Sequence, residues 1–403
     1  MMIVLVLSLL NLIIAAGLIY HYVLLLAGRR SRVPPVRESP IQPPTHLRYA
    51  IAIPAHNESG VIGRTVNRLQ TLVYPKDHYD VHVVADYCVD DTAPVAAAAG
   101  AQAHIRNEGP RGRKGYALDW LIRRLLADPR HYDVIVVFDA DSQVDGEFLL
   151  AVGRTMAEGV QVVQGRHVIS NPTTSLLTTL ADADMRLNNR IRNQAKQNLG
   201  LSARLMGDAM VFCREVLEQQ PWIGAQSLTE DRDYGLYLVT QGIRIHYTPD
   251  AISYGQAAAR WKDATPQRLR WYGGAFDLQR RYLPSLWKLA WRGNWDALDK
   301  LLELGLPPFS LLALGAALLF LVQLVLAILI SWPLTLTAVS ALSLLMAVLF
   351  PFFGLILTDA PAHSYRALLV GPFYILWRVG IGLWVRLRYR NLSWVRTRRT
   401  DDA

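Results

Sequence analysis

Asp139 and Asp141 are two carboxylates separated by one residue at the end of an apolar stretch. In an extended chain, residues two apart point to the same side, so the two charges repel each other unless a cation lies between them. Carboxylate oxygens suit Mg²⁺ or Mn²⁺, and Mg²⁺ is typically held by one or two carboxylates together with substrate phosphates. Because Asp is also common in solvated turns, the spacing alone leaves an ordinary turn as the alternative.

Two more acidic residues follow apolar stretches earlier in the chain. Glu58 follows IAIPAHN, and Asp86 ends DVHVVAD. Ligands of parallel sheets bind outside the carboxyl ends of the strands. We therefore expect Glu58 and Asp86 to share a site with the aspartate pair.

A basic, glycine-rich loop, RNEGPRGRKGYALDW (106–120), places Lys114 just before an expected helix. Backbone amides at a helix start, together with a lysine, can hold phosphate oxygens. The spacing is not that of a Walker motif, so a flexible basic loop is the alternative.

The segment SLTEDRDYGLYLVTQG (227–242) begins an expected helix with Thr229, Glu230 and Asp231. Thr and Asp favour helix caps, and acidic side chains complement the helix dipole, so capping alone explains the pattern. The functional alternative is a carboxylate that acts as a general base.

The segment TPQRLRWYGG (265–274) combines Gln267, Arg270 and Trp271 shortly before the chain becomes apolar. The planar guanidinium of Arg270 suits bidentate contact with phosphate. Trp271 offers a flat apolar face to a sugar ring, or it packs at a membrane surface. The two glycines that follow are expected to let the chain bend.

These residues lie in a region where strand and helix patterns alternate. The expected strands cover 49–58, 80–87, 101–105 and 132–141, and the expected helices cover 60–72, 91–99 and 114–127. Such alternation predicts an α/β fold with a mostly parallel central sheet.

Apolar segments flank this domain. Residues 3–27 contain no acidic residue, Lys or Arg, and further apolar runs cover 306–330 and 332–357. Each is long enough to cross a bilayer as a helix. No charge precedes the first segment and GRRSRVPPVR follows it, which favours a retained anchor over a cleaved signal peptide. The positive-inside rule then predicts a multi-pass protein of the cell (inner) membrane with a cytoplasmic domain.

The segment 366–386 contains Arg378 and precedes a basic tail, which favours an amphipathic helix in the interface over a third crossing after the domain. The net charge of +9 gathers beside the apolar segments, which indicates membrane lipids rather than nucleic acid as a partner. The two cysteines fit a reducing compartment and show no metal-binding spacing. The expected division is a transmembrane helix at 1–28, a domain at 45–275, interfacial helices at 276–305, two transmembrane helices at 306–357, and an interfacial or transmembrane helix with a basic tail at 360–403.

Taken in order, the motifs resemble those of the family-2 glycosyltransferases, the group of cellulose, chitin and hyaluronan synthases and ceramide glucosyltransferase. The matching stretches are IPAHNE (53–58), VVADYCVDDTA (83–93), RKGYAL (113–118), FDADS (138–142), MGDAMVF (206–212), LTEDRDYGL (228–236) and QRLRW (267–271). The resemblance implies a GT-A-type domain. Tyr87 and Asp208 depart from the residues common at their positions.

The resemblance also implies roles for individual residues. Asp86 would contact the uracil of a UDP-sugar near Glu58, and Lys114 would lie by the nucleotide. Asp139 and Asp141 would form the DxD motif, which meets the diphosphate through Mg²⁺ or Mn²⁺. Asp231, beside Glu230, would be the catalytic base. Gln267, Arg270 and Trp271 would form the QxxRW motif by the diphosphate and the acceptor channel.

The function implied is inverting transfer from a UDP-sugar to a membrane-associated acceptor, which forms a β-glycosidic bond. The acceptor is a growing glycan or, alternatively, a single lipid molecule. Few membrane crossings favour a lipid or short acceptor unless interfacial helices contribute or the protein forms oligomers. A nucleotide-sugar sensor without catalytic activity is the alternative from another class, and the intact acidic residues and Arg270 argue against it.

Overall fold

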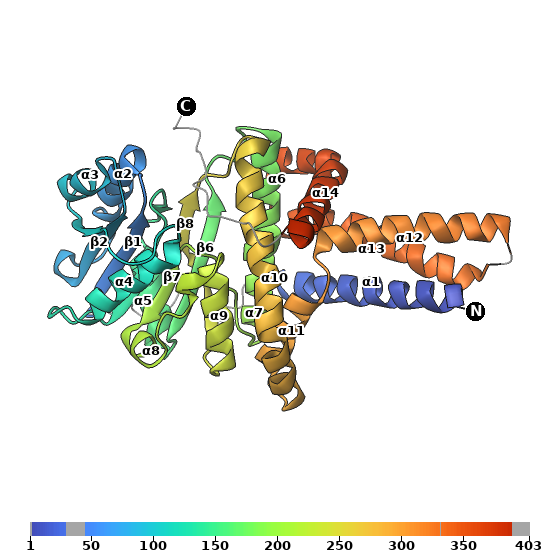
Figure 1. Ribbon diagram of the computed structural model, residues 1–403, viewed down its shortest axis with the longest axis horizontal. Helices are drawn as coiled ribbons and strands as arrows, with labels where there is room; N and C mark the ends of the chain where they lie inside the picture. Colours follow the sequence, from blue (N-terminus) through green and yellow to red (C-terminus); the bar gives the residue numbers. More distant parts are fainter. Residues whose placement is uncertain (1, 30–44, 331, 389–403) are drawn as a thin grey trace.

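The computed structural model describes residues 2–29, 45–330 and 332–388. An α/β domain occupies one end of the molecule, and long apolar helices project from the other (Figure 1). The basic tail expected beyond residue 388 lies outside the described residues.

One eight-stranded sheet forms the centre of the α/β domain, with the order β3-β2-β1-β4-β7-β6-β8-β5 among the described residues. The strands are β1 (Tyr49–Ala55), β2 (Tyr79–Asp86), β3 (Gln102–Arg106), β4 (Val134–Val137), β5 (Gln143–Val144), β6 (Val162–Ile169), β7 (Met210–Cys213) and β8 (Ile245–Gly255). Strands β3, β2, β1 and β4 are parallel, whereas β7 is antiparallel to both of its neighbours. The predicted parallel sheet is thus confirmed for the half that carries the first three acidic motifs.

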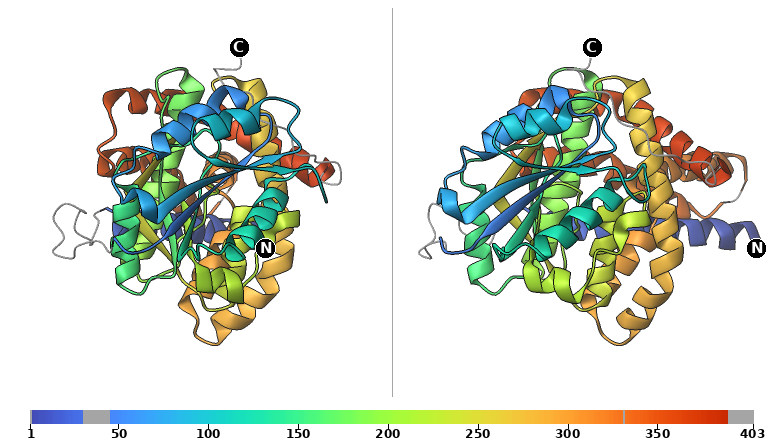
Figure 2. Two further views of the ribbon diagram at one scale, coloured as in Figure 1. Left: turned by 90° about the vertical axis from the view of Figure 1, so that its left-hand side faces the viewer. Right: turned by 60° about the vertical axis from the view of Figure 1, so that its left-hand side comes forward.

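Helices cover both faces of this sheet (Figure 2). They are α2 (Ser59–Leu69), α3 (Thr92–Ala98), α4 (Lys114–Leu126), α5 (Phe148–Ala157), α6 (Leu176–Met185), α7 (Arg192–Asn198), α8 (Arg214–Gln219) and α9 (Glu230–Thr240). Successive residues of β1 point to opposite faces, so Ile51 and Ile53 enter the core under α2, while Ala50 and Ala52 enter the core under α4. Burial on both faces explains the nearly continuous apolar sequence of this strand.

The strand expected at 132–141 is shorter in the structure. Strand β4 ends at Val137, and Asp139 and Asp141 lie in the turn that follows it. The Phe138 amide still donates to the Ala52 carbonyl, but the next amide, that of Asp139, donates to a carboxylate oxygen of Asp208 instead of a neighbouring strand. The aspartate pair is therefore positioned by a turn and not by an extended chain.

Helix α10 (Trp261–Trp291) is one continuous helix of 31 residues that contains the whole segment 265–274. The expected bend at Gly273 and Gly274 is wrong, because both glycines are buried within the helix. A Cβ atom on Gly274 would lie 2.5 Å from the Thr229 hydroxyl oxygen, so the glycine lets α10 approach the start of α9 closely. Helix α11 (Trp295–Gly305) then turns back against α10.

Four described helices are long and apolar enough to cross a membrane, judged by length and composition. They are α1 (Met2–Ala27), α12 (Phe309–Leu329), α13 (Leu334–Leu357) and α14 (Ala362–Arg388). Helices α1, α12 and α13 pack on one another as a bundle, whereas α14 lies at the end of that bundle nearest the sheet and contacts α6 and α10 (Figure 1). The expectation that the segment 366–386 lies in the interface as an amphipathic helix stays a prediction.

Candidate active site

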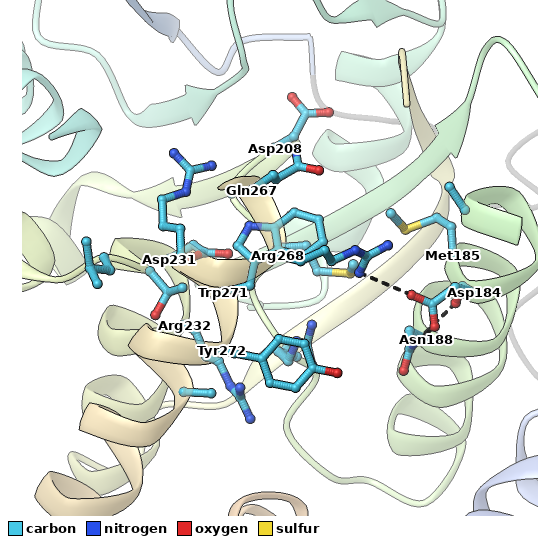
Figure 3. A pocket seen from close by; sticks show the side chains of 18 of the residues that line it. Asp184, Met185, Asn188, Asp208, Asp231, Arg232, Gln267, Arg268, Trp271 and Tyr272 are labelled. Atoms are coloured by element: carbon cyan, nitrogen blue, oxygen red, sulfur yellow. Dashed lines mark hydrogen bonds and ion pairs between the residues drawn. The ribbon is translucent and has the colours of Figure 1, made fainter. Parts of the chain in front are cut away.

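A cavity of about 990 Å³ begins at the carboxyl ends of β1, β2 and β4 and continues to the apolar helices. Side chains of α6, α9 and α10 meet around it (Figure 3). All ten residues singled out from the sequence line this cavity: Glu58, Asp86, Lys114, Asp139, Asp141, Glu230, Asp231, Gln267, Arg270 and Trp271. The structure thus brings the separate motifs together, and their chemical roles remain predictions.

Asp208 fixes the turn that carries the aspartate pair. One of its oxygens accepts hydrogen bonds from the Asp139 amide at 3.0 Å and the Ser142 hydroxyl at 2.6 Å, and the other accepts from His167 Nδ1 at 2.8 Å and the Ser253 hydroxyl at 2.6 Å. Burial opposes ionisation, but these donors outweigh it and hold the pKa of Asp208 well below its usual range. Asp208 is therefore a buried anion that positions the backbone of Asp139.

His167 is the charged partner of Asp208. Burial works against protonation of the imidazole, yet the hydrogen bond and the negative charge of Asp208 raise the pKa of His167 above its usual value. In the sequence, Asp208 is only a departure from the common family pattern, and His167 belongs to none of the matching motifs. The signal in the sequence was the charge of Asp208 within MGDAMVF (206–212), whose other residues are small or apolar.

Lys114 is the first residue of α4 and lies next to Asp139. Its Nζ is 2.5 Å from Asp139 Oδ1 and 4.0 Å from Glu230 Oε1, and it also donates to the Gly207 carbonyl at 2.6 Å. Burial alone would lower the pKa of Lys114, but the charges of Asp139 and Glu230 raise it above its ordinary value. The lysine is thus a fixed positive charge between two of the acidic motifs.

Glu230 and Asp231 form the start of α9, where the helix dipole favours negative charge. Burial raises the pKa of Glu230 to about 7; the charges of Lys114 and Arg270 oppose this rise and that of Asp231 adds to it. A Cβ on Gly207, whose φ is +84°, would lie 3.4 Å from Asp231 Oδ2. The Asp231 carboxylate therefore faces the cavity beside a backbone that has no side chain.

The end of the cavity at the strands also includes the end of β2 and the basic loop. Asp86 is in a buried ion pair with Arg106, and burial, which Arg106 opposes, raises the pKa of Asp86. Tyr87 follows with a φ of +50°, its hydroxyl donates to the Gly109 carbonyl at 2.7 Å, and the Arg111 guanidinium lies 4.1 Å from its ring centroid. Tyr87 therefore ties the basic loop to the end of β2.

Arg270 and Trp271 reach the cavity from α10, while Arg268 on the same helix faces α6 (Figure 3). The Arg268 guanidinium lies 4.6 Å from the centroid of the Trp271 ring and 3.5 Å from Asp184 Oδ2. Such a cation on the face of an indole holds the ring in place.

Asp184 on α6 is a half-buried anion that sequence reasoning missed. Besides Arg268 it accepts from Arg378 Nη1 at 3.1 Å, and Arg378 Nε donates to the Tyr272 hydroxyl at 3.0 Å. Arg378, which argued against a membrane crossing in the sequence, thus points at α6 and α10 and lines the cavity. No local pattern identifies this contact, because Asp184 and Arg378 are 194 residues apart.

A sheet of this order, with paired carboxylates after β4 facing a cavity at the strand ends, is that of a GT-A glycosyltransferase domain. The model of the family "Glycosyltransferase like family 2" matches residues 44–274, more than half of the chain, and the protein belongs to this family.

Curated relatives include a glycolipid synthase and a probable glycosyltransferase. A beta-monoglucosyldiacylglycerol synthase of Trichormus variabilis is 27% identical over 378 residues, which cover 88% of this chain and 77% of that protein. The probable glycosyltransferase YdaM of Bacillus subtilis is 25% identical over 284 residues, which cover 68% of this chain and 66% of that protein. The chain thus matches about two thirds to three quarters of these relatives.

Among solved structures, a mannosyltransferase of Pyrobaculum calidifontis, PcManGT, in complex with GDP-Man and Mn²⁺, is similar with a TM-score of 0.54. Its sequence identity is 17%, and the match covers 93% of this chain and 99% of that one. At this identity the likeness establishes the fold.

Proposed function

We propose that the protein transfers a sugar from a UDP-sugar to the hydroxyl group of a membrane lipid, with inversion at the anomeric carbon. The observation that carries this proposal is one continuous cavity, which joins Asp139, Asp141 and Asp231 to Leu24 of α1 and Phe309 of α12. A polar donor and an apolar acceptor can meet only where both kinds of surface line one space.

The donor end suits a nucleotide diphosphate. Lys114 and Arg270 supply positive charge, and Asp86 supplies an acceptor for the N–H of a uracil ring. Asp139 and Asp141 fit Mg²⁺ or Mn²⁺, because two carboxylates completed by substrate phosphates is a usual environment for such an ion. When bound, the ion would withdraw charge from the diphosphate and make it a better leaving group.

Proton removal from the acceptor falls to Asp231. Its carboxylate faces the cavity beside Gly207. The positive charges of Lys114 and Arg270 act on the neighbouring carboxyl group of Glu230. Asp231 would take the proton while the acceptor oxygen forms a bond to the anomeric carbon and the bond to the diphosphate breaks. A single displacement from an α-linked donor gives a β-linked product. Arg270 and Lys114 would stabilise the charge that develops on the leaving group.

A growing glycan is the second candidate acceptor. It is supported by Trp271, whose ring lines the cavity, and by relatives that include probable glucomannan 4-beta-mannosyltransferases. A lipid acceptor is supported by the apolar end of the cavity and by the name of the Trichormus relative. The expected location in either case is the cell membrane, with several crossings and the catalytic domain on the cytoplasmic side.

The test uses the purified full chain with Mn²⁺, a panel of UDP-sugars, and GDP-mannose as the contrasting donor. Nucleotide release is measured with and without an extract of membrane lipids, and the product linkage is determined by NMR. Release of UDP that depends on lipid, with a β-linked glycolipid as product, supports the proposal. Release from GDP-mannose alone overturns the donor, an α-linkage overturns inversion, and growth of a polymer identifies the glycan as acceptor.

A further inference from the structure

Three arginines surround the part of the cavity between Asp231 and the apolar helices. Arg192 comes from α7, Arg204 from the segment before β7, and Arg232 from α9 directly after Asp231. None of them belongs to a motif that explains donor binding. Arginine is the side chain best suited to hold phosphate, because its planar fork makes two parallel hydrogen bonds.

The orientation of Arg192 is fixed by the first helix. The Nδ1 atom of His21 lies 2.8 Å from the Gly17 carbonyl, so this nitrogen carries the proton and donates. The other ring nitrogen, Nε2, then accepts from Arg192 Nη2 at 3.2 Å. A neutral histidine of α1 thus directs the guanidinium without cancelling its charge.

Apart from Asp231, the acidic side chains nearby, Asp299 and Glu303, are paired with lysines. Glu303 is in an ion pair with Lys196, and Lys300 lies 3.5 Å from the same carboxylate. Lys196 also pairs with Asp299 at 2.9 Å. Arg204 reaches this group through Glu303 Oε1 at 3.5 Å. Two buried lysines and an arginine therefore share two carboxylates, which leaves an excess of positive charge.

Arg232 has no ion-pair partner within residues 2–29, 45–330 and 332–388. Burial and the like charges of Arg204 and Arg192 lower the pKa of Arg232 to about 10, although Glu303 and Asp231 oppose this effect. Grouping like charges in a partly desolvated space is unfavourable unless an anion binds among them.

The surroundings separate this group from the donor end. The charges that act on Arg232 are those of Arg204, Glu303, Asp231 and Arg192, whereas Lys114 and Arg270 act on Glu230. Asp231 is flanked in the chain by Glu230, on which the charges of the donor end act, and by Arg232, on which those of Arg192 and Arg204 act. The region on the Lys114 side belongs to the proposed donor site, and the region on the Arg232 side faces α1 and α11.

Next to the arginines the cavity wall becomes apolar. Leu24, Leu306, Phe309 and Phe350 line this end. An amphiphile with an anionic headgroup matches both surfaces. We propose that Arg192, Arg204 and Arg232 form a subsite for the phosphate of a phospholipid-type acceptor, whose chains lie toward α1 and α12. This inference rests on the proposed function, because it specifies the class of acceptor for the same site.

Binding of lipid tests this inference without any need for sugar transfer. Purified full chain is titrated with a fluorescent phosphatidic acid, and unlabelled phosphatidic acid, diacylglycerol with the same acyl chains, inorganic phosphate and UDP compete for it. Phosphatidic acid is expected to compete at least about tenfold better than diacylglycerol, because charge-assisted hydrogen bonds are lost with the phosphate. Equal competition by the two lipids would overturn the subsite, and equal competition by inorganic phosphate would overturn its assignment to a lipid.

Variants identify the arginines. Arg232→Gln and Arg204→Gln are each expected to weaken the binding of phosphatidic acid about tenfold. Arg232→Lys, which keeps the charge, is expected to weaken this binding less. Arg123→Gln removes an exposed arginine of α4 and should leave binding unchanged. UDP affinity should be unchanged in Arg232→Gln; a tenfold loss there would assign the arginine to the donor site and refute the inference.

Sugar transfer is then measured separately to phosphatidylglycerol, which carries a phosphate and free hydroxyl groups, and to diacylglycerol. Arginine-dependent lipid binding with no turnover of any UDP-sugar would reject the proposed function and leave the anionic subsite standing. Transfer that is equal for the two lipids and indifferent to Arg232→Gln for both would reject the subsite and leave the proposed function standing.

Discussion

Lys114 and Asp139 are joined by an ion pair of 2.5 Å between Nζ and Oδ1, at the point where the basic loop meets the turn after β4. The same ammonium group donates to the Gly207 carbonyl and lies 4.0 Å from Glu230. One lysine thus links three segments that are distant in the sequence. It can both position Asp139 and carry the charge that a diphosphate needs.

Replacing Lys114 by Gln is expected to lower kcat/KM for the donor by roughly 10²- to 10³-fold, because a preorganised charge at the leaving group is lost. The measurement is UDP release at several donor concentrations. Arg123→Gln, on the exposed far end of the same helix, is the control and should retain full activity. An unchanged kcat/KM in Lys114→Gln would exclude the lysine from the reaction.

Asp231→Asn is expected to keep the affinity for UDP and to lose transfer by at least about 10²-fold, because only the group that removes the proton is changed. UDP binding by calorimetry and transfer by UDP release are measured on the same preparation. The neighbouring Asp233 provides the contrast: it accepts hydrogen bonds from Tyr282 and Arg281, both at 2.6 Å. Asp233→Asn should lower the melting temperature, whereas Asp231→Asn should not.

Asp208→Asn is expected to destabilise the domain by about 2–3 kcal/mol and to lower activity. The amide oxygen can still accept from Asp139 and Ser142, but the amide nitrogen then faces the protonated His167. Melting temperature and UDP release are measured together. Ser142→Ala, which removes one donor and leaves the pair with His167 intact, should cost about 1 kcal/mol. Equal melting of Asp208→Asn and the wild type would contradict the structural role.

The Glu230→Gln variant is expected to be more stable than the wild type at high pH and about equally stable at low pH. The carboxyl group has an ordinary pKa of 4.5 and a folded pKa of about 7, so the folded state binds the proton more tightly than the unfolded chain. The folded protein is therefore destabilised progressively as the pH rises from about 4.5 to 7, and the effect is constant above that window.

The measurement is the difference in melting temperature between Glu230→Gln and the wild type at pH 4 and pH 8. We expect almost no difference at pH 4, below the window, and a gain on the order of 2–4 °C at pH 8. Glu158→Gln changes an exposed glutamate and should show no such dependence on pH. A gain that is equal at both pH values would refute the assignment to titration of Glu230.

Chelation by EDTA is expected to stop UDP release, and added Mn²⁺ or Mg²⁺ to restore it, because the ion is proposed to bind the diphosphate. Asp141→Asn should raise the concentration of ion needed for half activity at least about tenfold, since one of two carboxylate ligands is lost. Asp145→Asn alters a residue outside the cavity and serves as the control. Full activity in EDTA would contradict a role for the metal.

The residues of the candidate site were predictable because ligands of a parallel sheet bind at the carboxyl ends of its strands. Asp86 ends β2, and Glu58 and Asp139 follow β1 and β4, so a parallel arrangement of these strands brings the three together. The end of β4 was less predictable. The Asp139 amide donates to the carboxylate of Asp208, 69 residues away, instead of to a neighbouring strand, so the strand ends at Val137.

The supporting anions were not predictable for the same reason. Asp184 owes its position to Arg268 and Arg378, which belong to helices far along the chain. The glycines after Trp271 show a different limit: their composition indicated a bend, whereas the structure uses the missing side chain of Gly274 to pack one helix against Thr229. Absence of a Cβ serves flexibility and close approach equally, and only tertiary contacts decide between them.

Helix α10 runs across the direction of the apolar helices α1, α12 and α13 (Figure 1). It carries Arg270 at the candidate active site and the exposed Trp287 and Trp291 near its far end, and its 31 residues span about 46 Å. Indole rings of this kind favour the headgroup level of a bilayer. If they are held there, α10 lies along the membrane surface, so Arg270 and the donor end of the cavity stay at the level of the headgroups, and a lipid acceptor reaches Asp231 without leaving the bilayer.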